Sequence, residues 1–164
     1  MKIWISNRQR KTALNPETVR KKVRKILDAL GWADAEVSLT LVSDRAMARL
    51  NRETFGRRGP TNVIAFPVDR PEDGGGGRMP AGDPDPVSPG ASPPPPVLGE
   101  VVISVETTRR QADETGWPWE ELFEFYLIHG ILHLVGQDHD TPENDAAMTA
   151  RTWELLDIVR GAGD

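Results

Sequence analysis

The segment "WPWEELFEFYLIHGILHLVG" (residues 117–136) constrains the fold more than any other part of the chain. Pro118 suits the first position of a helix and Gly136 suits the turn that ends one. Between them, apolar residues cover nearly every side of the predicted helix. A helix that is apolar all round is stable only when it is buried. We therefore expect this helix at the centre of the fold.

The remaining elements are predicted from shorter patterns. Alternating or β-branched runs indicate four strands, and the last two of these read as central strands. The strands are expected at residues 2–6, 36–42, 61–66 and 97–105. Capping signals indicate four further helices. These helices are expected to begin at Asn15, Ser43, Glu106 and Thr141, with Met47, Leu50, Phe55, Met148, Leu155, Leu156 and Val159 facing inward.

Residues 69–97 differ from the rest of the chain. They hold nine of its 14 prolines and six of its 15 glycines. Such a composition cannot bury enough apolar surface to form a packed element. We expect a disordered or extended insertion within one domain that spans residues 1–164.

Composition and charge limit the chemistry. The chain has no cysteine, so a metal must be held by histidine or carboxylate. Residues 1–60 hold 14 Lys+Arg against 6 Asp+Glu, whereas residues 61–164 hold 6 against 19. The basic half suits a face for phosphates, or simply solvated helix faces. With no signal peptide or membrane-spanning stretch in the sequence, we expect a cytoplasmic protein.

The three histidines of the chain all fall in "HGILHLVGQDH". His129 and His133 are four residues apart, which places both imidazoles on one face of a helix. Gly136 can end that helix, so that His139 returns as a third ligand. Three imidazoles with water in the fourth position describe a catalytic zinc site, although nickel also accepts imidazoles. The alternative is that the histidines are only buried side chains.

The histidine spacing is also that of metzincin peptidases. Those enzymes need a glutamate directly after the first histidine to take a proton from water. Gly130 stands at that position. A peptidase of this kind would need Glu100 or Asp138 as a replacement base. For a phosphodiester, the further requirement is an arginine near the phosphate oxygens. Arg57 and Arg58 are candidates, unless they belong to an ordinary basic loop.

Three segments together resemble the YbeY family of bacterial endoribonucleases. These segments are "GRRGPTNVIAFP", "LGEVVIS" and "HGILHLVGQDH". The resemblance implies an α+β, zincin-like fold with a mixed four-stranded sheet covered by about five helices. It implies one zinc ion on His129, His133 and His139, with Arg57, Arg58 and His133 as catalytic candidates. Family members often show Asp where this chain has Glu100, and Asp or Asn at the position of Asn62.

The resemblance also implies a biological setting. It indicates single-strand-specific cleavage of RNA, maturation of the 3' end of small-subunit ribosomal RNA, and ribosome quality control. The expected partners are ribosomal RNA and the ribosome, with ribosomal or GTPase proteins as further candidates and neither DNA nor membrane. Two alternatives stay open at this point: a non-catalytic ribosome assembly factor with structural zinc, and a zinc hydrolase of another substrate such as peptide.

Overall fold

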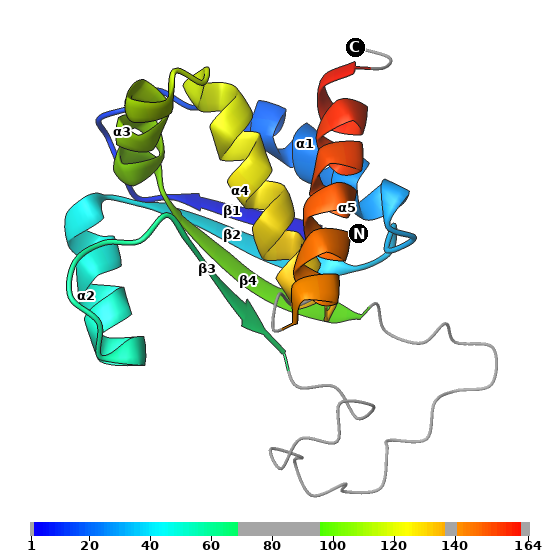
Figure 1. Cartoon of the computed structure of the whole chain (residues 1–164), viewed down its shortest axis with the longest axis horizontal. Coiled ribbons are helices and arrows are strands. Elements are labelled where there is room, and N and C mark those ends of the chain that lie inside the picture. The colour runs from blue at the N-terminus through cyan, green and yellow to red at the C-terminus, as the bar shows by residue number, and fades with distance from the viewer. Residues whose placement is uncertain (1, 69–95, 137–140, 162–164) are drawn as a thin grey trace, which may run out of the picture.

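The computed structural model describes residues 2–68, 96–136 and 141–161, which form an α+β fold (Figure 1). Four strands and five helices lie in these residues, as expected. The elements in chain order are β1 (Lys2–Asn7), α1 (Pro16–Ala29), β2 (Glu36–Val42), α2 (Asp44–Phe55), β3 (Val63–Pro67), β4 (Val97–Ser104), α3 (Val105–Thr115), α4 (Trp119–Leu134) and α5 (Pro142–Gly161).

The four strands form one mixed sheet in the order β1-β2-β4-β3. Strands β1, β2 and β4 run parallel, while β3 is antiparallel to β4. The prediction of a central strand is confirmed for β4 and wrong for the segment 61–66, because β3 lies at the sheet edge. Its β-branched residues are explained by packing instead: Val63 lies against α4, and Ile64 is buried on the other face.

The helices cover the two faces of the sheet unequally. Helices α1, α4 and α5 lie together over one face, and α2 lies alone on the other side (Figure 1). The buried side chains divide in the same way. The larger cluster joins α1, α4 and α5 to the sheet, and a smaller one joins Met47 of α2 to Val42, Ile64 and Val102.

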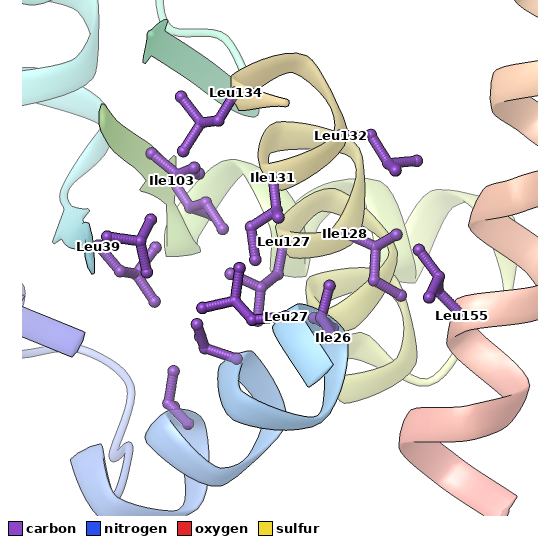
Figure 2. Close-up of a cluster of buried hydrophobic side chains, with 14 of the residues drawn as sticks. Ile26, Leu27, Leu39, Ile103, Leu127, Ile128, Ile131, Leu132, Leu134 and Leu155 are labelled. Atoms are coloured by element: carbon purple, nitrogen blue, oxygen red, sulfur yellow. The ribbon is translucent and has the colours of Figure 1, made fainter. Parts of the chain in front are cut away.

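Helix α4 is the central element of the larger cluster, as its sequence predicts. Ile131 and Leu134 lie toward Ile103 in the sheet, while Ile128 lies toward Leu155 of α5 (Figure 2). All five side chains are fully buried. Burial of each such side chain stabilises the fold by roughly 1.5–3 kcal/mol, so α4 connects the sheet to the outer helix α5.

Most of the predicted helix ends are confirmed. The Asn15 side chain accepts a hydrogen bond from the Glu17 backbone N–H at 2.9 Å, and Ser43 caps α2 in the same manner. Helix α4 begins at Trp119, one residue later than predicted, so Pro118 occupies the N-cap and not the first helical position. Phe55 was expected to face inward, and that prediction is wrong. The ring is 52% exposed, because α2 ends there and the chain leaves the core.

Two further predictions concern the proline- and glycine-rich insertion and the absence of a membrane-spanning segment. Almost all of the proline- and glycine-rich insertion, residues 69–95, lies outside the described residues. Within residues 2–68, 96–136 and 141–161, no helix has the combination of length and apolar character needed to cross a bilayer.

Candidate active site

Two of the three predicted ligand residues lie together on α4. The ring centroids of His129 and His133 are 4.8 Å apart, and the ring planes are inclined at 76°. Both side chains are half-buried. This is the arrangement expected of residues one helical turn apart. His139, the predicted third ligand, lies outside the described residues, as does Asp138.

Both histidines line one open cavity, which we call the cleft. It has a volume of about 620 Å³. Its walls come from the end of α2 and the loop after it, from β3, and from the C-terminal half of α4. The lining residues are Asn51, Phe55, Arg57, Thr61, Asn62, Val63, Ile64, Ala65, Pro67, His129, Gly130, His133 and Gly136. A volume of this size is typical of small-molecule or substrate sites.

Gly130 explains why α4 lies so close to the sheet. A Cβ atom at this position would approach Cγ1 of Val101 to 2.6 Å and Cγ2 of Val63 to 3.2 Å. Real Cβ atoms essentially never come within 3.0 Å of another atom, so the contact with Val101 would force a shift, and the contact with Val63 would be tight. A glutamate at position 130 would therefore point into packed valines. The structure gives a steric reason, besides the sequence, why a metzincin-type base is absent from this helix.

The two candidate arginines are separated by the structure. Arg57 lines the cleft, whereas Arg58 is not among the lining residues. The Arg57 guanidinium also lies 5.9 Å from the centre of the Phe55 ring, within range of a cation–π contact. Both arginines are exposed. Of the two arginines, the structure places Arg57 in the wall of the cleft.

The loop that carries Arg57 is held by a buried amide. Asn51 is 6% exposed, and its Nδ2 donates a hydrogen bond to the Gly59 carbonyl at 3.0 Å. The Arg57 backbone N–H donates to the Asn51 carbonyl at 3.4 Å. Gly56 ends α2 in the left-handed region with φ of 66°, which turns the chain toward the cleft. These contacts place Arg57 at the cleft wall.

Asn62 belongs to a polar network that sequence reasoning missed. Its Nδ2 donates to Oε1 of Gln111 at 3.4 Å, and the Tyr126 hydroxyl donates to the same oxygen. Burial raises the pKa of the Tyr126 phenol, and a hydrogen bond with Asn62 opposes that shift. Tyr126 precedes His129 by three residues and so shares its side of α4. That spacing is the one sequence signal that could have revealed the network.

Glu100, considered as a replacement base, lies on the wrong face of the sheet. Successive side chains of a strand point to opposite faces. Val101 faces Gly130 of α4, so its neighbour Glu100 faces away from the histidines. Thr40 Oγ1 donates to Glu100 Oε2 at 2.6 Å, and Glu100 pairs across the sheet with Phe66, a member of the α2-side cluster. The strand alternation excludes it as a base at the cleft.

The donor set in the cleft fits a metal such as zinc. Two imidazoles one turn apart, both opening into the same cavity, have the ligand type and spacing that zinc accepts. Among the described residues, His129 and His133 are not joined by a further His, Cys, Asp or Glu to make a group of three.

Known proteins resemble this chain over nearly its whole length. The family described as Endoribonuclease YbeY matches residues 4–160. A protein of that name from Syntrophotalea carbinolica is 38% identical, with 96% of this chain and 95% of the relative covered. Another from Symbiobacterium thermophilum is 37% identical, with 95% and 96% covered.

A solved structure supports the same assignment. The solution structure of a Thermotoga maritima protein superposes with a TM-score of 0.66 at 26% identity, covering 97% of this chain and 89% of the other. The fold and the full-length similarity agree. The chain belongs to the YbeY family of endoribonucleases.

Proposed function

We propose that this protein is a single-strand-specific, zinc-dependent endoribonuclease, built as one hydrolase domain, whose reaction takes place in the cleft. One observation carries the proposal. His129 and His133 open into a cavity that also presents Arg57, and Gly130 between them leaves no room for a peptidase base. The cleft thus combines metal-ligand chemistry with a cation for phosphate.

The proposed ligands of one zinc ion are His129, His133 and His139. Bound zinc supplies Lewis acidity, which lowers the pKa of a water molecule toward neutrality. The ligand imidazoles must be neutral to bind the metal. His129 and His133 also define the side of the cleft at which the scissile phosphate has to lie.

Arg57 is the proposed electrostatic partner of that phosphate. The transition state of phosphodiester cleavage gathers negative charge on the phosphate oxygens, and a fixed guanidinium stabilises this charge. Asn51 holds the loop on which Arg57 stands. Asn62, also in the cleft wall, donates one N–H of its amide to Gln111, and the second N–H can donate to a substrate oxygen. We assign no comparable role to Arg58.

A direct assay compares RNA and protein substrates. Purified protein is incubated with single-stranded RNA, double-stranded RNA and casein, each with and without a chelator. We expect cleavage of single-stranded RNA only, and its loss with the chelator. Metal analysis of protein purified without an affinity tag identifies the ion and its ratio to protein. Casein cleavage without RNA cleavage would refute the nuclease proposal.

A ribosome assembly factor with purely structural zinc is the main competing function. This hypothesis includes the same zinc ion but predicts that the protein cleaves no RNA. Under that hypothesis, chelation would lower the melting temperature by removing folding free energy. The cleft favours catalysis, because a cavity of about 620 Å³ beside the ligands leaves room for substrate. Two results together would favour the competing function: no cleavage of RNA by the metal-bound protein, and unfolding of the protein when a chelator removes the metal.

The proposed cellular substrate is the 3' end of small-subunit ribosomal RNA, with ribosome quality control as a second task. Support comes from family membership and from the basic N-terminal half of the chain. Ribosomes, and ribosomal or GTPase proteins that act on them, are the proposed partners, in the cytoplasm. Mapping 3' ends of small-subunit RNA in cells depleted of the protein tests this: extended precursors are expected.

A further inference from the structure

A second cavity lies on the other side of α4, between that helix, α1 and α5. We call it the basic groove. Its volume is about 590 Å³, close to that of the cleft. The lining residues are Thr18, Lys21, Lys22, Arg24, Lys25, Asp28, Glu124, Val159 and Arg160. None of them lines the cleft, so the groove is a separate feature of the surface.

Positive charge dominates the basic groove. Five basic and two acidic side chains line it, which leaves three positive charges in excess, although the whole chain has a net charge of -5. Along α1, Lys21 is followed by Arg24 and Lys25 at the spacing of helical neighbours. Like charges at this spacing destabilise a helix by roughly 0.2–0.5 kcal/mol per pair. An anion bound between them would remove that repulsion.

Glu124 organises the floor of the groove. It is 3% exposed, and its two oxygens accept hydrogen bonds from different helices. Lys22 Nζ of α1 lies 2.9 Å from Oε1, and Arg160 Nη1 of α5 lies 2.6 Å from Oε2. A buried carboxylate is costly unless it is paired in this way. Glu124 therefore holds the two cationic side chains in fixed positions next to each other. Cationic side chains on an ordinary solvated surface would have no such fixed position.

The groove lies opposite the histidines. With 3.6 residues per turn, Glu124 is rotated about 140° from His129 and about 180° from His133, and it lies about 14 Å from His133 along the axis. A ligand in the groove cannot be the reacting phosphate. It can be another part of a long polyanion that also enters the cleft.

We propose that the basic groove is an exosite for the phosphodiester backbone of the RNA substrate, away from the cleavage point. This inference rests on the proposed endoribonuclease function. Lysine and arginine on one groove wall suit the regularly spaced phosphates of a single strand, which are bound without regard to base sequence. Lys21 and Arg24 are exposed at the rim and make the first contacts.

Cleavage kinetics with two RNA lengths test the exosite. The test variant combines Lys21→Gln with Arg24→Gln. The control combines Arg10→Gln with Arg45→Gln, which removes the same charge from exposed positions outside both cavities. Substrates are single strands of about 20 and about 6 nucleotides, the shorter being about the length that one binding site covers.

We expect the test variant to raise KM for the long RNA about tenfold, with kcat unchanged and the short RNA unaffected. Loss of two phosphate contacts should also reduce the slope of log KM against log salt by about 1.4. The control should match the unmodified protein. Equal KM changes in both variants, or equal changes for both RNA lengths, would overturn the exosite. If the unmodified protein cleaves neither RNA, the proposed function itself fails.

Discussion

The two sides of α4 carry cavities of similar size but different chemistry. The cleft, at about 620 Å³, contains two imidazoles of the kind that bind zinc, His129 and His133. The basic groove, at about 590 Å³, contains a buried carboxylate already shared between Lys22 and Arg160. Size alone therefore does not identify the reacting site.

The difference between them shows what separates a reaction site from a binding surface. In the groove, Glu124 is paired with Lys22 and Arg160, and Lys21 and Arg24 are exposed at the rim. In the cleft, Arg57 reaches the cavity from the loop after α2, and both histidines reach it from α4. Convergence of unlike groups is what catalysis requires. Each prediction below acts on one side of α4 and should leave the other unchanged.

His133→Ala should have the largest effect on cleavage. Loss of one proposed zinc ligand should reduce kcat/KM on the order of a thousandfold, because the metal no longer activates water. The melting temperature should fall only slightly, since His133 is half-buried at the cleft wall. Parallel measurement of cleavage and thermal unfolding checks this. Collapse of the fold, with no folded inactive protein, would instead favour structural zinc.

Arg57→Ala should reduce kcat/KM by about a hundredfold, because a fixed charge at the developing oxyanion is lost. Arg58→Ala is the matched control: it removes the same charge from the neighbouring residue, which is not part of the cleft lining. The kcat/KM of the control should fall by no more than a few-fold. Equal losses in the two variants would show that the loop acts through general charge and not through placement.

Gly130→Ala should destabilise the protein by about 1–3 kcal/mol, because the added methyl group overpacks the contact with Val101. Gly161→Ala is the control in α5, where an added Cβ meets none of the described residues within 4 Å. The control should be neutral or slightly stabilising, since alanine favours helix. Denaturant unfolding measures both. Equal stability of the two variants would contradict the close packing of α4 on the sheet.

Glu124→Gln should lower stability by about 1–2 kcal/mol, because Lys22 and Arg160 lose the charge that pairs them. The partial exposure of both cations keeps the cost moderate. Cleavage of a short RNA should be unchanged, since the groove lies away from the cleft. Urea unfolding and cleavage of about 6-nucleotide RNA are the measurements. A large loss of short-RNA cleavage would show that the two sides are coupled.

Tyr126→Phe should have the smallest effect, a few-fold loss of kcat/KM, because Asn62 is less firmly held without the hydroxyl. Stability at alkaline pH provides a second signature. Burial raises the pKa of Tyr126 above its ordinary value of 10.0. The unfolded chain therefore loses this proton first, and stability falls as pH rises above 10.0. The variant should lack that part of the alkaline decline.

Local signals in the sequence were enough to place most helices and strands, and to place His129 and His133 on one face of a helix. Residues 36–42 form the predicted strand, and the Asn15 and Ser43 caps begin their helices. His129 and His133 share a helical face because their spacing alone requires it. The close packing at Gly130 could not be predicted in this way, because it depends on Val101 and Val63 from two different strands.

The sequence by itself determined the number and approximate places of the helices and strands, which helix is central, and that two histidines share a helical face, because these follow from neighbours within a few residues. Only the tertiary structure decided that β3 is an edge strand, that Glu100 faces away from the histidines, that Arg57 and not Arg58 enters the cleft, and that Glu124 joins α1 to α5. These outcomes depend on contacts between residues far apart in the chain. Such contacts are set by strand pairing and helix packing, which local patterns do not encode.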